Sequence, residues 1–558
     1  MAQSMPAPAA SAAAHDWRDG VVYQIYPRSF ADHDGDGTGD LPGIIDHLDH
    51  FGPDRLPIEA IWLSPIYPSP GRDLGYDVSD HTTVDPLLGT DQDFDRLVAG
   101  CHGRGIKVIL DLVMNHTSDE HPWFLASKAS REGPYADFYL WRDPSGWEEN
   151  GTPLPPNNWV SFFGGPGWEW VPGRGQFYYH TFLVQQPELN WRNPAVEAAQ
   201  WDMVRGWLDR GVDGFRLDVF NAYLKDPELR SNPVIEGNSP WARQDHRYDI
   251  YQADFPELIE RFRAIVDERP GRMTIGELFS RETELAAKYA RDWHIVFDWS
   301  LMESRWTAAA YAASIDRRER SFGPDLWPTV ALSNHDRERQ ATRLSASVGR
   351  DREPDRDAIA KAAAVVILGL RGTPFLYYGE EIGMVDVDIP RDEIVDPPAL
   401  LAGPDFPWYD RSRCRTPMQW SSGPGAGFTT GRPWLRLGPD AANRNVESEV
   451  PDPDSVFGCY SRVLAFRATS AALRRGGMTR LESGAADVLA WTREAAAERL
   501  LVLVSFVGET RTVDLAGIAP GTSWTPRVGT RREPSAPSDH GRLELAPDEA
   551  VILESVER

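Results

Sequence analysis

The segment Gly214-Phe-Arg-Leu-Asp-Val-Phe-Asn221 is a short apolar run that ends in polar side chains. A run of this kind predicts a strand that is buried in a parallel sheet. A helix is predicted directly before it, because Asn193 can cap that helix, Pro194 suits its first turn and Gly211 can end it. This helix and this strand form one unit of an α/β fold.

Seven further apolar runs alternate with helical patterns along the chain, including a predicted helix over 91–102. The eight predicted strands cover residues 21–26, 60–63, 107–113, 214–217, 273–275, 294–297, 329–332 and 375–378. Continuous apolar strands that are separated by helices imply a parallel sheet covered on both faces. Eight such units predict an α/β fold of the TIM-barrel type, a (β/α)8 barrel.

The chain departs from this repeat in three places. Residues 117–186 follow the third strand, are rich in Trp, Pro and Gly, and predict an inserted domain B because they are too long for a simple loop. Residues 385–420 follow the eighth strand and predict an active-site loop. Residues 477–558 predict a C-terminal antiparallel β-sandwich domain, with strands over 488–492, 500–506, 510–515, 542–545 and 550–553. The barrel then comprises residues 17–116 and 187–476.

The composition excludes several classes of protein. Of the 558 residues, 41% are hydrophobic and 25% are charged, which is typical of a folded chain rather than a disordered one. The net charge of −26 argues against nucleic acid and anionic membranes as partners, because both require a basic surface. The sequence has no run of about 18 apolar residues, so we expect no transmembrane helix. The 21 tryptophans fit either sugar-ring stacking or a large aromatic core.

The N-terminal residues 1–16 predict a disordered tail, because they are rich in Ala, Pro and Ser. No Lys or Arg precedes Arg18, and the segment has no apolar core, so it does not fit a signal peptide. Cys101, Cys414 and Cys459 are too far apart in sequence for a zinc or redox motif. These features predict a cytoplasmic protein.

Polar residues gather at the carboxyl ends of four predicted barrel strands. The clusters are Asp111-Leu-Val-Met-Asn-His116, the Arg216 to Asn221 part of the opening segment, Ile275-Gly-Glu277-Leu278 and Ser333-Asn-His-Asp336. A single Asp at a strand end is more often a cap or a turn residue. Four clusters on one rim of a barrel, however, converge on one point and predict a catalytic site.

The residue types in these clusters favour glycoside hydrolysis. Asp218, Glu277 and Asp336 supply carboxyl groups, and in a pair one can attack or activate water while the other protonates the leaving oxygen. Arg216 lies two residues before Asp218 on the same strand face, so we expect its guanidinium to lower the pKa of Asp218 and keep it anionic. The general acid requires a pKa raised by burial or by like charge.

These motifs resemble the α-amylase superfamily (glycoside hydrolase family 13), especially its exo-acting α-glucosidase and oligo-1,6-glucosidase branch. The resemblance covers nearly the whole chain and includes Val22-Tyr-Gln-Ile-Tyr-Pro-Arg-Ser-Phe30, Gln186-Pro-Glu-Leu-Asn190 and Arg415-Thr-Pro-Met-Gln-Trp420. It implies a retaining mechanism without a catalytic cofactor. In that mechanism Asp218 is the nucleophile, Glu277 is the acid and then the base, and Asp336 stabilises the transition state.

The resemblance also implies a set of substrate-binding residues around the terminal glucose. They are Asp73, Tyr76, His116, Phe163, Arg216, Val219, His335, Arg339 and Arg415. Asp73 and Arg415 match residues that grip the non-reducing end, and Tyr76 matches a stacking platform. A surface salt bridge is the alternative for Asp73 and Arg415. If they close the far end of the sugar site, the site is a pocket that releases one glucose at a time.

Substrate preference is less well defined by the sequence. Val219 follows the nucleophile, and Val at this place is similar to the α-1,6-acting enzymes of the branch. Phe162, Phe163, Trp168 and Trp170 either line the +1 and +2 subsites or fill the core of the inserted domain. The expected substrates are short α-glucosides of the isomaltose, maltose or sucrose type. A glucosyl-transferring relative would use the same residues, so both activities stay open.

A separate acidic loop predicts a structural metal site. Residues 32–40 read Asp-His-Asp-Gly-Asp-Gly-Thr-Gly-Asp. The predicted oxygen donors are Asp32, Asp34, Asp36, Asp40 and the backbone carbonyl of Thr38. The loop lacks the bidentate Glu of a full EF-hand, but a similar loop binds Ca²⁺ or Mg²⁺ in the branch named above. An acidic turn without metal is the alternative.

We expect a small oligosaccharide as the only partner of a monomer or homodimer. A non-catalytic, transporter-associated relative is a different class of function. It would lack catalytic carboxylates or carry a membrane span, whereas Asp218, Glu277 and Asp336 are all present.

Overall fold

The computed structural model describes residues 17–348, 354–401, 409–538 and 540–556. The predicted tail over 1–16 and residues 402–408 of the predicted active-site loop lie outside the described residues. Within the described ranges, no helix is both long and apolar enough to cross a membrane.

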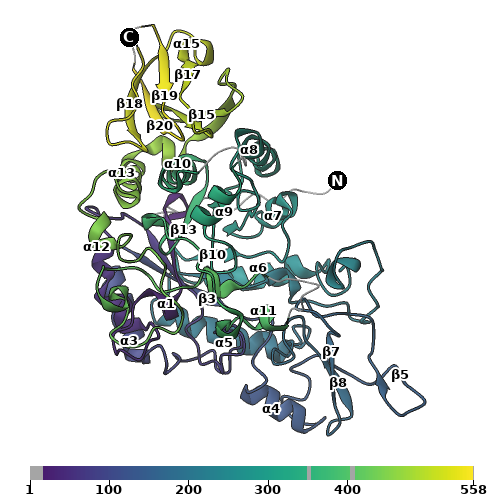
Figure 1. Cartoon of the computed structure of the whole chain (residues 1–558). Helices are drawn as coiled ribbons and strands as arrows, with labels where there is room; N and C mark the ends of the chain where they lie inside the picture. The colour runs from purple at the N-terminus through teal and green to yellow at the C-terminus, as the bar shows by residue number, and fades with distance from the viewer. Residues whose placement is uncertain (1–16, 349–353, 402–408, 539, 557–558) are drawn as a thin grey trace, which may run out of the picture.

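Eight parallel strands form one nearly closed barrel sheet (Figure 1). The strands are β1 (Val22–Ile25), β2 (Ala60–Leu63), β3 (Lys107–Leu112), β9 (Gly214–Leu217), β10 (Met273–Gly276), β11 (Ile295–Val296), β12 (Thr329–Ala331) and β13 (Thr373–Tyr377). Their order is β11-β10-β9-β3-β2-β1-β13-β12. The Thr329 hydroxyl links β12 to the β11 segment, because it donates to the Val296 carbonyl at 3.3 Å and accepts from the Asp298 amide at 2.9 Å. The predicted TIM barrel is confirmed.

The helices between these strands cover the outside of the barrel. The longer ones are α3 (Asp91–His102), α5 (Pro194–Asp209), α6 (Phe255–Val266), α8 (Ala308–Phe322), α10 (Arg356–Gly369) and α13 (Val456–Thr469). The shorter ones are α1 (Pro27–Phe30), α2 (Leu41–Asp46), α7 (Thr283–Tyr289) and α9 (Gln340–Ala346). Asn193 caps α5 by accepting from the Ala195 amide at 3.0 Å, and Gly211 after its end adopts a φ of 96°. Pro194 is the first residue of α5, so all three signals predicted for this helix are confirmed.

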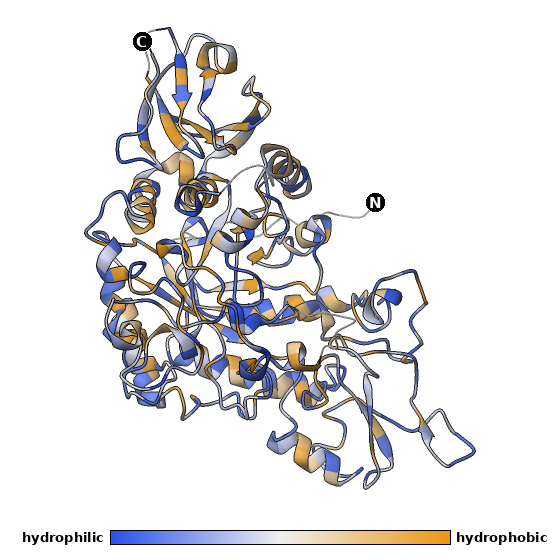
Figure 2. Cartoon of the chain, in the orientation of Figure 1, coloured by the Kyte–Doolittle hydropathy of each residue, from blue (hydrophilic) through white to orange (hydrophobic). Residues whose placement is uncertain are grey.

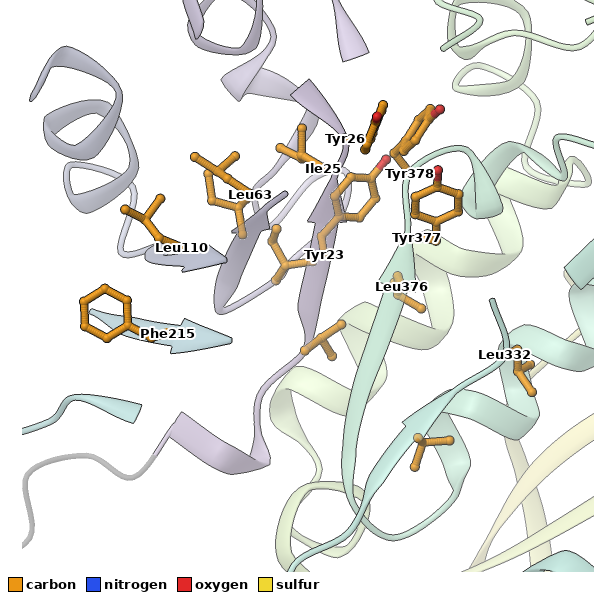
Figure 3. Close-up of a cluster of buried hydrophobic side chains, with 14 of the residues drawn as sticks. Tyr23, Ile25, Tyr26, Leu63, Leu110, Phe215, Leu332, Leu376, Tyr377 and Tyr378 are labelled. Atoms are coloured by element: carbon orange, nitrogen blue, oxygen red, sulfur yellow. The ribbon is translucent and has the colours of Figure 1, made fainter. Parts of the chain in front are cut away.

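The barrel strands are buried on both faces, as continuous apolar runs require. On β1, Val22 belongs to the cluster inside the barrel, whereas Tyr23 packs outward toward the helices. Figure 3 shows Tyr23 and Ile25 of β1 beside Leu376 and Tyr377 of β13. This rigid double-sided packing fixes the carboxyl ends of the strands, where the polar clusters lie.

The segment after β3 forms a small antiparallel unit beside the barrel (Figure 1). It carries α4 (Pro122–Ala129), β4 (Trp141–Arg142), β5 (Gly146–Trp147), β6 (Pro153–Leu154), β7 (Trp168–Val171) and β8 (Gln176–Tyr179). Trp159, Trp168, Phe177 and Tyr179 form its own buried cluster, against which Trp170 packs. For Trp168 and Trp170, the second alternative therefore holds, because both fill the core of this unit.

The last part of the chain is an antiparallel sheet domain, as predicted. Its larger sheet has the order β14-β15-β16-β20-β18, and β17 pairs with β19 in a second sheet. The strands are β14 (Gly477–Leu481), β15 (Val488–Ala495), β16 (Glu498–Ser505), β17 (Arg511–Asp514), β18 (Ser523–Gly529), β19 (Arg542–Leu545) and β20 (Ala550–Val556). Figure 2 shows hydrophobic and hydrophilic bands alternating along these strands. One apolar cluster joins the two sheets, and Trp491 on the other face donates to the Gly369 carbonyl of α10 at 3.1 Å.

Candidate active site

The catalytic carboxyl groups expected from the sequence lie at the carboxyl ends of neighbouring strands. Asp218 follows the last residue of β9, and Glu277 follows the last residue of β10. In the sheet register, Asp111 of β3 lies opposite Arg216 of β9, and Arg216 lies opposite Ile275 of β10. The register therefore brings the polar ends of three strands together at one rim, where TIM-barrel enzymes build their active sites.

Arg216 is the centre of this arrangement. Its guanidinium donates to Asp111 at 2.7 Å and to Asp218 at 2.8 Å, and its second terminal nitrogen contacts Glu277. The side chain is fully buried, and its guanidinium lies 5.3 Å from the centre of the Trp62 ring. One guanidinium therefore holds the Asp218 and Glu277 carboxyl groups side by side. Retaining glycosidases need such closeness, with carboxyl groups about 5–5.5 Å apart.

The expectation that Arg216 lowers the pKa of Asp218 overall is wrong. Burial raises that pKa to about 7, and Arg216 opposes the rise only in part. Burial also raises the pKa of Glu277 to about 8, with Asp218 and Asp336 adding to the rise and Arg216 opposing it. One cation faces three buried carboxyl groups, so Arg216 cannot offset all of their desolvation. The order of the two values still suits an ionised nucleophile beside a protonated acid.

The Asp336 carboxyl group, in contrast, is held in the ionised state. Burial alone would raise its pKa, but His335 and the guanidinium groups of Arg411 and Arg415 outweigh burial and place the pKa well below its usual value. Arg415 contacts Asp336 at 2.8 Å and Arg411 contacts it at 3.2 Å. A permanent negative charge at this position can accept sugar hydroxyls and stabilise positive charge that develops on a sugar ring.

These pKa values predict a narrow pH optimum and a way to move it. If Asp218 is the nucleophile and Glu277 the general acid, as expected from the sequence, activity requires Asp218 ionised and Glu277 protonated, so kcat/KM should fall below about pH 7 and above about pH 8. Asp111 is a like charge that raises the pKa of Asp218. Asp111→Asn should therefore move the acid limb of the kcat/KM profile to lower pH by about one unit. Asp316→Asn, a surface control, should leave both limbs in place, and an unmoved acid limb in Asp111→Asn would contradict this assignment.

Asp73 forms an ion pair in the lining of the cavity, but its arginine is not the expected one. Arg411 contacts Asp73 at 2.6 Å and the fully buried Asp396 at 2.8 Å. Arg415, which the sequence paired with Asp73, instead donates to the His335 carbonyl at 2.8 Å and to Asp336. The side chains of Asp73 and Arg411 are only 6% and 10% exposed. Asp73 and Arg415 are both buried and have other partners, so the alternative of a surface salt bridge between them is wrong.

Tyr76 and the two histidines are fixed by hydrogen bonds. The Tyr76 hydroxyl donates to Asp111 at 3.0 Å and lies 2.6 Å from His335 Nε2. The Tyr76 and His335 rings are stacked, with centroids 5.4 Å apart. Gln186 of the Gln-Pro-Glu motif donates to Asp73 at 3.1 Å and lies 3.2 Å from His116 Nε2. This motif thus holds Asp73 and His116 in place in the lining of the cavity.

The site opens into a cavity of about 640 Å³, large enough for a disaccharide. Eight of the predicted site residues line it: Asp73, Tyr76, His116, Phe163, Asp218, Val219, Glu277 and Asp336. Four predicted site residues, Arg216, His335, Arg339 and Arg415, lie behind that wall as buried supports. Arg339 is the clearest departure from its expected role, because its guanidinium donates to the Tyr378 carbonyl at 2.7 Å beneath the site. Arg337, two residues earlier, lines the cavity instead.

The cavity has an aromatic wall, of which the sequence analysis considered only two residues. Phe162, Phe163, Trp241 and Phe279 line it, and the Phe162 and Phe279 rings lie 4.6 Å apart. For Phe162 and Phe163, lining the cavity was one of the two alternatives that the sequence left open. Trp241 and Phe279 had no signal beyond being aromatic residues in loops after β9 and β10. Such a wall can hold the apolar faces of a second sugar ring.

Val219 follows Asp218, lines the same cavity and has a strained backbone conformation. Its φ of 38° and ψ of 40° are left-handed, which is rare for a β-branched residue. Its amide lies 3.5 Å from Glu277 Oε2. Strain of this kind persists only where the surrounding structure fixes the backbone, and it turns the Val219 side chain into the cavity lining.

The acidic loop brings part of its predicted donor set together. Carboxylate oxygens of Asp32, Asp34 and Asp40 lie within 4.8 Å of one another. Asp36 is not part of this group, and its carboxylate accepts from the Thr38 amide at 2.7 Å. Oxygen donors alone suit a hard cation such as Ca²⁺ or Mg²⁺, so these residues fit the expected ion.

Three comparisons with known proteins bear on this site. The family model described as "Alpha amylase, catalytic domain" matches residues 24–476. A probable alpha-glucosidase of Rhizobium meliloti is 40% identical over 514 residues, which cover 89% of this chain and 91% of that protein. An oligo-1,6-glucosidase of Heyndrickxia coagulans is 36% identical over 550 residues, which cover 92% of this chain and 95% of that protein. The crystal structure of the alpha-glucosyl transfer enzyme XgtA is similar with a TM-score of 0.87 and 38% identity, over 97% of this chain and 99% of that one.

Proposed function

Because the chain belongs to the α-amylase family, glycoside hydrolase family 13, we propose that it is an exo-acting α-glucosidase that releases terminal glucose with retention of configuration. Membership of the family makes the chain a glycoside hydrolase, and the family needs no catalytic cofactor. The observation that carries the proposal is the buried ion pair between Asp73 and Arg411, at 2.6 Å, in the lining of a cavity that Phe162, Trp241 and Phe279 also line. We infer that this pair closes the end of the site that receives the terminal glucose.

The reaction follows from the positions of two carboxyl groups. The Asp218 carboxylate attacks the anomeric carbon and breaks the glycosidic C–O bond, while Glu277 gives its proton to the leaving oxygen. This step leaves a glucosyl ester on Asp218 and an ionised Glu277. Glu277 then takes a proton from water as the water attacks the ester, which releases α-glucose and restores both groups. Asp336 holds negative charge beside the sugar throughout.

Glucosyl transfer is a second candidate function, because the similar enzyme XgtA is described as an alpha-glucosyl transfer enzyme. The same ester serves both outcomes, and the choice depends on whether water or a sugar hydroxyl reaches it. The aromatic wall of Phe162, Trp241 and Phe279 gives an acceptor sugar a surface to occupy. Product analysis at high sugar concentration separates the two, since transfer yields longer glucosides and less free glucose.

We propose that Val219 biases the enzyme toward α-1,6 linkages, since its side chain lines the cavity next to the nucleophile. The test is the initial rate of glucose release from isomaltose, maltose, sucrose and soluble starch. Isomaltose should lead, and starch should be inert because the Asp73–Arg411 pair blocks a through-running chain. If maltose or sucrose leads, Val219 does not set linkage, and rapid endo-cleavage of starch would contradict the closed pocket.

We propose that Asp32, Asp34 and Asp40 hold a structural Ca²⁺ or Mg²⁺ ion. Such an ion would stabilise the fold by binding the folded state alone. A chelator should lower the melting temperature by about 2 °C or more without a comparable change in the kcat of residual folded enzyme. Asp32→Asn should remove most of this sensitivity. An equal chelator response in the variant and the parent would contradict the site.

A cytoplasmic location and a monomeric or homodimeric state are further proposals. All three cysteines are buried and free, and burial raises the pKa of each thiol to about 12. Free, buried thiols without disulfides are typical of proteins in a reducing compartment, and this supports the proposed cytoplasmic location.

A further inference from the structure

Two arginines line the active-site cavity but have no part in the mechanism above. Arg281 lies in the loop that continues from Glu277 after β10, and Arg337 directly follows Asp336. Glu277 is proposed to protonate the leaving oxygen, so we place the leaving group, the aglycone, beside this loop. Phe279 of the aromatic wall belongs to the same loop.

The two guanidinium groups share one carboxylate. Arg281 Nη1 lies 3.2 Å from Glu303 Oε1, and Arg337 Nη2 lies 3.6 Å from the same oxygen. Within the described part of the chain, neither guanidinium donates a hydrogen bond, and neither contacts another carboxylate. The side chains of Arg281 and Arg337 are 57% and 38% exposed, so an occupant of the cavity can reach them.

Glu303 does not offset the charge of both arginines. Burial lowers the pKa of Arg281, Arg337 lowers it further, and Glu303 opposes the fall only in part. The repulsion between the two cations is therefore not fully relieved by the protein itself. A carboxylate or a phosphate group beside them would relieve it, and its oxygens match the donor geometry of a guanidinium.

The carboxyl groups deeper in the site have cations of their own. Asp218 and Glu277 contact Arg216, and Asp336 contacts Arg415 at 2.8 Å. These contacts leave Arg281 and Arg337 without a catalytic carboxyl group to support. The cavity thus combines a carboxylate-rich inner part with a cationic patch where we place the aglycone.

We propose that Arg281 and Arg337 form a subsite for an anionic group on the aglycone. The preferred substrates are then α-glucosides whose leaving group carries a carboxylate or a phosphate. The anion would accept hydrogen bonds from both guanidinium groups, and Glu303 would compete with it. This inference rests on the proposed hydrolysis and narrows its substrate class.

Three glucosides that differ only at the far end of the aglycone provide the test. In them glucose is α-1,6-linked to sorbitol, to gluconate or to sorbitol 1-phosphate, so the leaving oxygen belongs to a primary alcohol in each. The measured quantity is kcat/KM for each anionic substrate divided by kcat/KM for the neutral one, at low ionic strength. This ratio cancels a general loss of activity, so it separates recognition of the anion from a merely structural effect.

In the parent the larger ratio should be roughly fivefold or more and should fall at high salt, because half-exposed charges are screened. Arg281→Gln and Arg337→Gln should each lower that ratio about threefold, whereas Glu303→Gln should raise it by removing the competing carboxylate. Arg317→Gln is the matched control, because Arg317 lies outside the cavity lining and its partner, 3.9 Å away, is an exposed carboxylate. It should leave the ratio unchanged.

The outcomes are distinguishable. A larger ratio for the phosphate supports a phosphate subsite, and a larger ratio for gluconate supports a carboxylate subsite. Ratios near one in the parent, or a preference that neither Arg281→Gln nor Arg337→Gln weakens, would overturn the proposal while isomaltose is still cleaved. Absence of glucose release from isomaltose and from all three glucosides would overturn the proposed hydrolysis, and this inference with it.

Discussion

Asp218→Asn should reduce glucose release from every α-glucoside by a factor on the order of 10⁴ or more, because the amide cannot form the glucosyl ester. The fold should persist, since the amide keeps the size of the side chain and Arg216 keeps its contacts with Asp111 and Glu277. Melting temperature and initial rates on isomaltose measure the two effects separately. Activity within tenfold of the parent would contradict the nucleophile assignment.

Glu277→Gln is the informative partner of that variant. It should lose most activity on isomaltose, whose leaving group needs a proton, but keep more activity on a glucosyl fluoride, whose leaving group does not. Asp218→Asn should fail on both substrates. If Glu277→Gln lost equal activity on both substrates in the ester-forming step, Glu277 would not be the general acid.

Arg411→Met should lower kcat/KM for isomaltose on the order of 100-fold, because the buried carboxylates of Asp73 and Asp396 lose their cation. The terminal glucose would then meet an open end of the pocket that carries uncompensated negative charge. Slow cleavage inside longer chains should appear as the closed end opens. Kinetics on isomaltose and the product pattern from maltoheptaose measure both effects.

Arg413→Met is the matched control for Arg411→Met. Arg413 lies two residues away, and its partner Asp388 is an almost fully exposed surface carboxylate. Exposed pairs contribute little, so this variant should keep near-parental kcat/KM. Equal losses in the two variants would mean that the segment as a whole is disturbed, and that Arg411 does not close the pocket.

The barrel was predictable from sequence because buried parallel strands give continuous apolar runs. Ala60–Leu63 and Gly214–Leu217 have the predicted bounds. In the C-terminal domain two strands were missed. β14 is an edge strand with no buried residue, and β18 contains Pro526, next to which the register shifts. An edge or a bulge has no clean alternation of apolar residues to detect.

The positions of the two carboxyl groups proposed as catalytic were predictable for the same reason, since Asp218 and Glu277 directly follow regular strands. Arg411 was not, because the segment around residues 385–420 has no periodic pattern and carries several arginines close together. Which arginine reaches Asp73 depends on the short turn at Arg411–Arg413 and on the buried partner Asp396. The pKa of Asp218 was misjudged because a sequence displays a neighbouring charge but not the extent of burial.

The central claim is that terminal glucose leaves through an ester on Asp218. The most direct test is the anomer of the first glucose released, followed by proton NMR within the first seconds of isomaltose hydrolysis, before mutarotation. Two displacements at one carbon predict α-glucose as the first product, with β-glucose appearing only as the anomers equilibrate. β-Glucose as the first product would mean direct attack by water and would contradict the double-displacement account.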